Sequence, residues 1–293
     1  MQAPAPAPQQ GSFSTSVALY VGGVGLLTAM DSMAKEIFSR LPIVEVSCLR
    51  YVFGLLAVLP VIAWVRPGWP SREAILANGA RSLLSAVMAI MFFFALSTLP
   101  LAETVALSFL SPTFLALFSA WLLRERLSAS IGVALAVGFL GMMVIVSGQL
   151  GASRYGPLAP LGAASAFGSA IIYACSMVML KARAMRDAVP NIVLILNAGS
   201  GLVLAIPAYL QWHPIAIDDL FRLVAIGSLG TSGHLMLAHS FARHPASRLA
   251  PFEYSALIWA AGFGLVFFRE VPSLATLGGT VLIIISTILA SRR

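Results

Sequence analysis

Residues Leu99–Ser128 read LPLAETVALSFLSPTFLALFSAWLLRERLS, and residues His244–Ser273 read HPASRLAPFEYSALIWAAGFGLVFFREVPS. Each stretch has proline as its second residue, continues as a long apolar run, and ends in Arg-Glu with a serine three residues after the glutamate. Glu125 of the first stretch aligns without gaps with Glu270 of the second, at a displacement of 145 residues. The chain therefore carries one segment twice, and this repeat determines the predicted fold.

The composition excludes a soluble protein. Hydrophobic residues make up 59% of the chain and charged residues 10%, whereas a soluble domain has about a quarter charged residues. So few charges cannot cover a surface that faces water, so the predicted surroundings are a lipid bilayer. The net charge of +7 is then a signal of membrane topology, and no nucleic-acid partner is expected.

Ten apolar runs are long enough to cross a bilayer, which takes about 20 residues of helix. They lie near residues 15–37, 43–65, 78–97, 101–123, 129–148, 157–180, 190–211, 221–242, 248–268 and 273–291. Residues 1–14, whose start is rich in proline, alanine and glutamine, are expected to form a disordered tail. An even number of spans places both termini on the same side of the membrane.

The basic residues outside the spans are distributed unequally. The side that holds the termini carries Arg66, Arg72, Arg124, Arg126, Lys181, Arg183, Arg186, Arg243, Arg248, Arg292 and Arg293. The opposite side carries Lys35, Arg40, Arg154, Arg222 and Arg269. The positive-inside rule then predicts that both termini are cytoplasmic.

The internal repeat extends over most of the chain, since Pro42 also corresponds to Pro190 at a displacement of 148 residues. We therefore divide the chain into repeats at residues 15–148 and 157–291, each with five spans. Because five is odd, the second repeat enters the membrane upside down relative to the first. Inverted repeats are typical of secondary transporters. The predicted fold is an all-α integral membrane protein of ten transmembrane helices, arranged as two inverted five-helix repeats around a central cavity.

Ionisable residues inside spans are the first candidates for a functional site, because they are costly in a bilayer. His234 lies near the middle of the eighth span, next to glycines that allow a helix or a substrate to approach closely. The alternative is a histidine bonded to a neighbouring helix. The repeat places it opposite the third span, where one helical stripe carries Arg81, Ser85, Met88 and Phe92.

Three further charged residues leave alternatives open. Asp31 has Lys35 one turn later, so it is either part of an internal ion pair or a carboxylate that meets an ammonium group or a proton of the substrate. Glu253 is a second candidate, near the cytoplasmic end of the ninth span. Arg50 either pairs with Glu45, reaches the interface by extending its side chain, or contacts substrate.

Aromatic residues in the middle of spans are a second signal. Tyr173, Tyr254 and Trp259 lie where a tyrosine hydroxyl or an indole N–H needs a partner. Together with Met88 they predict a pocket for an amphipathic or apolar metabolite.

Several functions are not supported by any motif. The sequence has no phosphate-binding loop of the nucleotide hydrolases, and His234 and His239 are too far apart by one residue to share a helical face as metal ligands. No nucleophile and base converge in the pattern. We expect no catalytic residue, no metal site, no cofactor and no enzymatic activity.

The two opening stretches, the ten spans and the five-plus-five repeat resemble the EamA-type ten-helix members of the drug/metabolite transporter superfamily. The resemblance covers nearly the whole chain. It implies a central cavity lined mainly by the first, third, fourth, sixth, eighth and ninth helices. The chain departs from the pattern of many members, which carry Glu-Pro where this sequence has Ala256-Leu257. That departure bears on which substrate is carried.

The resemblance implies a secondary transporter of the inner membrane that works by alternating access. We expect export of small metabolites, in particular amino acids, including apolar or aromatic ones. The alternative is import of a nucleoside-type metabolite such as S-adenosylmethionine, because the LAPFEY stretch resembles some members with that role. The expected partners are the small-molecule substrate and the bilayer, and the expected working unit is a monomer.

Overall fold

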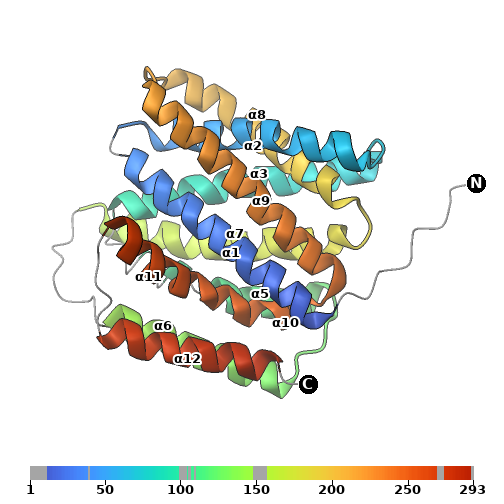
Figure 1. Cartoon of the computed structure of the whole chain (residues 1–293), viewed down its shortest axis with the longest axis vertical. Coiled ribbons are helices and arrows are strands. Elements are labelled where there is room, and N and C mark those ends of the chain that lie inside the picture. The colour runs from blue at the N-terminus through green and yellow to red at the C-terminus, as the bar shows by residue number, and fades with distance from the viewer. Residues whose placement is uncertain are drawn as a thin grey trace, which may run out of the picture.

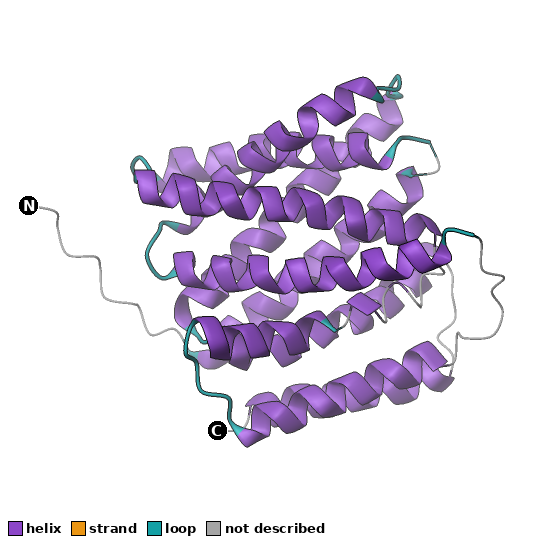
Figure 2. Cartoon of the chain, turned by 180° about the vertical axis from the view of Figure 1, so that it is seen from behind, coloured by secondary structure: helices purple, strands orange, loops and turns teal. Residues whose placement is uncertain are grey.

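The structure is a computed structural model, which describes residues 12–38, 40–98, 104, 107–108, 110–147, 157–268 and 274–291. Every regular element within these ranges is a helix, as Figure 2 shows. The all-α prediction is therefore confirmed. Helix α1 begins at Phe13, two residues before the predicted start of the first span at residue 15. Residues 1–11 of the predicted tail lie outside the described residues.

Helices of the first repeat follow the predicted order. They are α1 (Phe13–Ile37), α2 (Ile43–Val65), α3 (Arg72–Thr98), α5 (Ser111–Leu122) and α6 (Ala129–Ser147). Helix α3 begins six residues earlier than the predicted span at residue 78, because the polar turn before it is helical too. The predicted span 101–123 is described only in part, and α5 forms its last section.

The second repeat consists of α7 (Ala159–Ala184), α8 (Val189–Leu210), α9 (Ile217–Arg243), α10 (Ala246–Leu249), the 3₁₀ helix η1 (Ala250–Tyr254), α11 (Ser255–Phe268) and α12 (Leu274–Ser291). Among the described residues, six helices are long and apolar enough to cross a membrane: α1, α2, α3, α7, α8 and α9. Shorter apolar helices lie within α5, α6 and α12. The fold is that of an integral membrane protein.

Packing between the helices is symmetric with respect to exchange of the two repeats. Helix α1 packs against α9, and its counterpart α7 packs against α3. In the same way α1 contacts α11 while α7 contacts α5, and α2 packs against α8. Helices α6 and α12 pair with each other along one edge of the molecule (Figure 1). The two-repeat fold is thus present in the contacts, although the repeat boundaries 15–148 and 157–291 stay a prediction.

Ion pairs reinforce two of these helix contacts. One cluster lies near the start of α2 and joins the α1–α9 pair, and the other lies beyond the end of α2 and joins the α3–α7 pair. At one end, Arg40 pairs with Asp219 of α9 at 3.2 Å and Arg222 pairs with Glu36 of α1 at 3.4 Å. At the other end, Arg183 of α7 pairs with Glu73 of α3 at 2.5 Å. The α1–α9 and α3–α7 pairs are therefore each held together at one end of the bundle.

The ninth predicted span, 248–268, is helical throughout, but it is not one regular α-helix. It is divided into α10, η1 and α11. Pro251 lies in the 3₁₀ segment, where a proline has no N–H to donate and its ring clashes with the carbonyl four residues earlier. The break brings Glu253 within hydrogen-bonding distance of tyrosines on two other helices.

The Arg-Glu motif of the first repeat has a structural role at the start of α10. The carboxylate of Glu125 accepts hydrogen bonds from the backbone N–H groups of Ala246 at 3.1 Å and Ser247 at 3.0 Å. These are N–H groups of the first turn of α10, which have no acceptor within the helix. Glu125 of the first repeat therefore caps a helix of the second. Its counterpart Glu270 lies outside the described residues.

Replacing Glu125 by alanine is expected to destabilise the protein by about 0.5–2 kcal/mol, as for the loss of other helix caps. Arg126→Ala is the matched control, because Arg126 is exposed next to it in the chain. Thermal unfolding of the purified variants in detergent measures the difference. Equal melting temperatures for the two variants would show that the cap does not stabilise α10.

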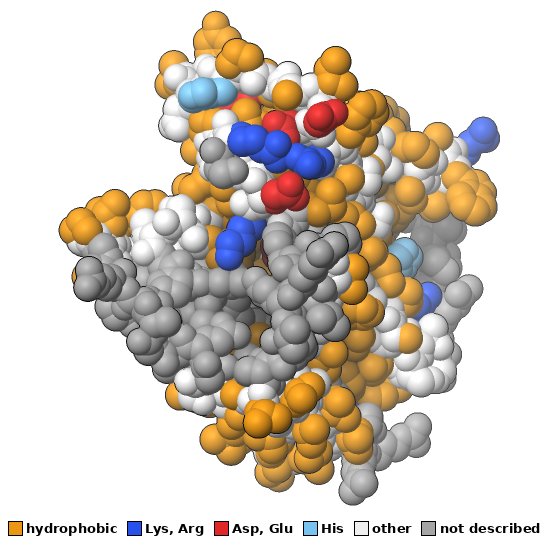
Figure 3. Space-filling view, turned by 60° about the vertical axis from the view of Figure 1, so that its left-hand side comes forward, with side chains coloured by type: hydrophobic (Ala, Val, Ile, Leu, Met, Phe, Trp, Pro, Cys, Tyr) orange, Lys and Arg blue, Asp and Glu red, His pale blue; other side chains and the backbone are white. Residues whose placement is uncertain are grey.

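The surface is rich in apolar side chains. Orange hydrophobic side chains occupy much of the described face in Figure 3, and blue and red side chains gather in one area. Trp64 and Trp69, at the end of α2 and just after it, are 89% and 99% exposed. Exposed tryptophans at a helix end are typical of the interface between membrane and water.

Candidate functional site

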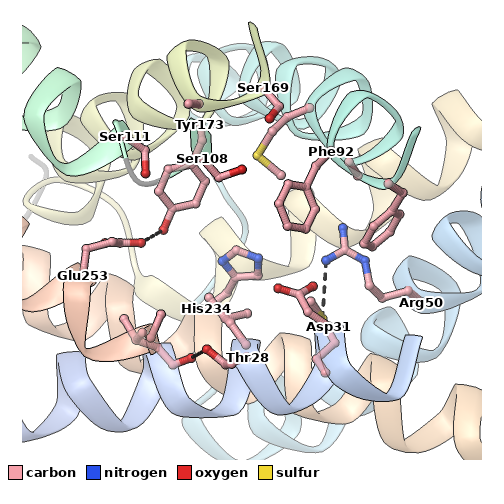
Figure 4. Close-up of a pocket in the computed structure, with 18 residues that line it drawn as sticks. Thr28, Asp31, Arg50, Phe92, Ser108, Ser111, Ser169, Tyr173, His234 and Glu253 are labelled. Carbon is pink, nitrogen blue, oxygen red and sulfur yellow. Dashed lines mark hydrogen bonds between the residues drawn. The ribbon is translucent and has the colours of Figure 1, made fainter. Parts of the chain in front are cut away.

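A cavity lies between the two repeats. It is lined by side chains of α1, α2, α3, α5, α7, α9, η1 and α11 and by Ser108, which precedes α5. Its volume is about 190 Å³, far above the roughly 10–15 Å³ that holds one water molecule. It is therefore a ligand-sized cavity and not a packing defect. Figure 4 shows its lining.

Six of the residues expected from the sequence line this cavity: Asp31, Met88, Phe92, Tyr173, His234 and Glu253. They come from five elements that are far apart in the chain. The three other expected residues, Ser85, Tyr254 and Trp259, lie elsewhere.

Ser85 and Tyr254 are buried away from the cavity. The hydroxyl of Ser85 hydrogen-bonds that of Ser176 at 3.1 Å, between α3 and α7. The ring of Tyr254 packs against Gly138 of α6 and next to Ser286 of α12. Both residues contribute to helix packing.

Trp259 lies on the outer surface, with 37% of its area exposed. Its indole N–H donates to the carbonyl oxygen of Val21 at 3.0 Å, and its ring stacks on Phe263 with centroids 6.0 Å apart. The indole N–H of Trp259 thus has the hydrogen-bond partner that a tryptophan within a span needs. That partner, the carbonyl of Val21, does not line the cavity.

One end of the cavity carries opposite charges. Asp31 of α1 interacts electrostatically with Arg50 of α2, and Figure 4 shows the two side chains directed toward one another. Arg50 is buried, with one nitrogen 3.4 Å from the sulfur of Met30 and its guanidinium 4.2 Å from the ring centre of Tyr51. Its Nε and Nη2 atoms have no hydrogen-bond partner among the described residues.

The sequence leaves three alternatives open for Arg50, and the structure places its side chain in the lining of the cavity. The alternative partner, Glu45, instead accepts a hydrogen bond from the backbone N–H of His213 at 3.0 Å. The position of Arg50 in α2 turns its side chain inward, toward α1.

The other end of the cavity is organised by Glu253 of η1. One carboxylate oxygen accepts a hydrogen bond from the hydroxyl of Tyr20 on α1, and the other accepts one from Tyr173 on α7. Tyr20 is fully buried and was not expected from the sequence, although the need of a mid-span hydroxyl for a partner applied to it as well. These two bonds join the first helices of both repeats to the broken segment.

Three hydroxyl groups of the lining donate their hydrogens to backbone carbonyls of their own segment. Thr28 donates to Val24 at 2.9 Å, Ser108 to Thr104 at 2.7 Å and Ser169 to Ala166 at 2.7 Å. Each oxygen then has its lone pairs left. These side chains therefore offer hydrogen-bond acceptors to the cavity, not donors.

His234 and Arg81 add two polar groups without partners near the middle of the bundle. The Nδ1 atom of His234 is buried and has no hydrogen-bond partner in the described part of the chain. The same holds for all three guanidinium nitrogens of Arg81, which is 1% exposed. Arg81 interacts electrostatically with Tyr173 and His234, but it does not line the cavity.

Within the described ranges, no group of three His, Cys, Asp or Glu side chains is placed so that it could hold a metal ion. The polar groups of the cavity are carboxylates, hydroxyls, one imidazole and one guanidinium. They are groups that bind a polar organic ligand by hydrogen bonds and charge.

A model of the EamA-like transporter family matches residues 16–147 and again residues 160–292. The chain belongs to the EamA-like transporter family. The two matches are consistent with the two repeats that pack symmetrically in the structure. Because the family is one of transporters, this EamA-like chain is a multi-pass membrane protein.

Two curated relatives match this EamA-like chain over nearly its full length. The pseudopaline exporter CntI of Pseudomonas aeruginosa is 30% identical, with 90% of this chain and 92% of that protein covered. An S-adenosylmethionine uptake transporter of Rickettsia bellii is 24% identical, with 94% and 93% covered. Both relatives are named as transporters of small metabolites and not as enzymes.

A solved crystal structure is similar over 97% of this EamA-like chain and 99% of its own length. The TM-score is 0.81 and the sequence identity is 19%. This likeness concerns the fold alone, and it agrees with the ten-helix, two-repeat architecture.

Proposed function

We propose that this protein is a secondary transporter that exports amino acids or amino-acid-derived metabolites across the inner membrane. The observation that carries the proposal is the placement of Asp31 and Arg50 together at one end of the cavity. A carboxylate beside a guanidinium is complementary to the ammonium and carboxylate groups that every free amino acid carries. The apolar wall with Met88 and Phe92 suits the carbon chain of such a ligand.

Alternating access is the proposed mechanism. The repeats are inverted, so the bundle has two related packings that open the cavity to opposite sides. The cavity lies between the repeats, and both contribute side chains to it. A monomer with both termini in the cytoplasm is sufficient for this mechanism, and we propose that working unit.

Import of S-adenosylmethionine is the second candidate. It is favoured by the similarity to the uptake transporter of Rickettsia bellii, whereas the similarity to the exporter CntI favours export. The same cavity serves both directions, because a secondary transporter runs along the gradient that is applied.

Flux in proteoliposomes tests the proposed function. The purified protein is offered labelled leucine, phenylalanine, lysine and S-adenosylmethionine, with and without a pH gradient. We expect saturable flux of at least one amino acid, and competition by unlabelled compound. A response to the pH gradient would identify a proton-coupled carrier, and no response a facilitator. Flux of S-adenosylmethionine alone would support the second candidate, and flux equal to that of protein-free liposomes for every compound would contradict both.

A further inference from the structure

We propose that the cavity selects a ligand with one carboxylate and two cationic centres, and not an amino acid with an apolar or aromatic side chain. This inference rests on the proposed transport function and names its substrate class more closely. It follows from the number and the placement of the acceptors, donors and charges that face the cavity.

Acceptors outnumber donors in the described lining. The acceptors are the carboxylates of Asp31 and Glu253 and the hydroxyl oxygens of Thr28, Ser108 and Ser169, whose hydrogens are used within their own segments. Arg50 is the strong donor, and the hydroxyl of Ser111 and the imidazole of His234 can each donate one hydrogen more. A complementary ligand therefore has more N–H donors than carboxylate oxygens. An ammonium group is suitable because it has three N–H donors.

The charges point to the same class of ligand. Among the described lining residues, Asp31 and Glu253 are formally negative when ionised, Arg50 is positive, and His234 is counted as neutral. The lining therefore carries one more negative than positive charge. A ligand of net charge about +1 matches this lining, because its second cation can contact Glu253 directly, whereas the buried cation Arg81 lies outside the lining.

Placement divides these charges into two subsites. Asp31 and Arg50 lie together, whereas Glu253 lies across the cavity with His234 between them, as Figure 4 shows. The first subsite fits an α-ammonium and an α-carboxylate. The second fits another cation, since two hydroxyls occupy the Glu253 carboxylate and about two of its roughly four lone-pair positions remain.

Apolar side chains connect the two subsites. Met88 and Phe92 of α3 and Leu27 of α1 line the cavity with them. A methylene chain or another uncharged spacer fits against this wall, so the two cationic centres are separated by apolar atoms. Arg81 stays outside the lining and acts electrostatically on Tyr173 and His234.

Matched pairs of compounds test the proposal on the wild-type protein. L-lysine and L-norleucine differ by the terminal ammonium group, and S-adenosylmethionine and S-adenosylhomocysteine differ by the positive charge on sulfur. Initial rates are measured in proteoliposomes with the membrane potential held at zero, so that the charge of the compound does not itself drive flux. We expect the cationic member of each pair to have a kcat/KM at least roughly tenfold higher, because an analogue that lacks the partner group leaves the buried carboxylate unpaired.

Two variants separate the subsites. Glu253→Gln keeps the shape of the side chain and removes its charge, and the lysine-to-norleucine ratio is expected to fall to within about threefold of one. Asp31→Asn acts on the ammonium group that both compounds share, so it is expected to lower both rates and keep their ratio. Size-exclusion chromatography shows whether each variant is folded, and the wild-type ratios hold independently of either variant.

The outcomes are distinguishable. Equal or faster transport of norleucine and S-adenosylhomocysteine by the wild type would overturn the two-cation proposal while the transport function stands. So would flux of phenylalanine with none of the four paired compounds carried. A folded Glu253→Gln variant with the wild-type ratio would overturn the assignment of Glu253. The absence of flux for every compound would overturn the proposed function together with this inference.

Discussion

Replacing Asp31 by asparagine is expected to lower kcat/KM for transport by roughly thirtyfold or more, which corresponds to the loss of about 2 kcal/mol or more for one member of a buried charge pair. Asp31 faces the cavity, and Arg50 is the charged neighbour that acts on it. The asparagine has nearly the same shape, but it leaves Arg50 without its counter-charge and the ammonium group of the substrate without a carboxylate. Initial rates of counterflow in proteoliposomes measure the effect.

Glu36→Gln is the matched control for this experiment. Glu36 lies on the same helix, and its side chain is 51% exposed in ion pairs with Arg40 and Arg222. Exposed pairs of this kind contribute about 0–1 kcal/mol, so transport should stay within about fivefold of the wild type. Should Asp31→Asn transport as well as Glu36→Gln, Asp31 is not part of the substrate site.

The second large effect is expected for Gly227→Ala, which tests the close crossing of α9 and α2. A Cβ atom at Gly227 would lie 2.6 Å from Cβ of Phe53 and 2.7 Å from the backbone nitrogen of Gly54. Backbone atoms cannot move aside as the end of a side chain does, so the two helices must separate. Overpacking of this kind is expected to lower the free energy of unfolding by about 1–3 kcal/mol.

Gly79→Ala is the control, because a Cβ atom at Gly79 would meet nothing within 4 Å. In a helix, alanine is favoured over glycine, so this variant should be as stable as the wild type or slightly more so. Unfolding by sodium dodecyl sulfate in mixed micelles compares the three proteins. If both alanine variants unfold at the same detergent fraction, the crossing is less tight than the structure shows.

Much of the fold could be predicted because the bilayer constrains the sequence strongly. Apolar runs mark the helices, and the odd number of spans in each repeat implies inversion. The break at Ala250–Tyr254 was missed because the length and composition of a run do not reveal a change of helix type within it. Pro251 was the available signal. The exact start of α3 was missed because its first residues are polar and lie before the apolar run.

The sequence indicated which helix faces carry candidate site residues, but not how far along each helix the cavity extends. Of the predicted stripe of Ser85, Met88 and Phe92 on α3, the cavity reaches only Met88 and Phe92. Helical periodicity says which residues share a face. It does not say how far along the helix a cavity extends, since that depends on the helices packed against it.

Trp259 shows a second limit. The expectation rested on the need of its N–H for a partner, and the carbonyl of Val21 is that partner on the outer surface. A sequence shows that a polar atom needs a partner but not which helix supplies it. Arg50 is the opposite case, because two of its nitrogens have no hydrogen-bond partner among the described residues.

The bonds of Tyr20 and Tyr173 to Glu253 have a consequence for how loading and opening are linked. One carboxylate holds α1 and α7 through two hydroxyls, so the helices cannot part there unless something else supplies the lost donors. In a dry interior an unsatisfied carboxylate is costly. A cationic ligand that binds to Glu253 can replace a tyrosine hydroxyl as the donor, so binding of the ligand and separation of the helices are linked at this carboxylate. Binding of the transported ligand would thus favour the opening that releases it. The bonds among Tyr20, Tyr173 and Glu253 would in turn reduce leakage through the protein without ligand.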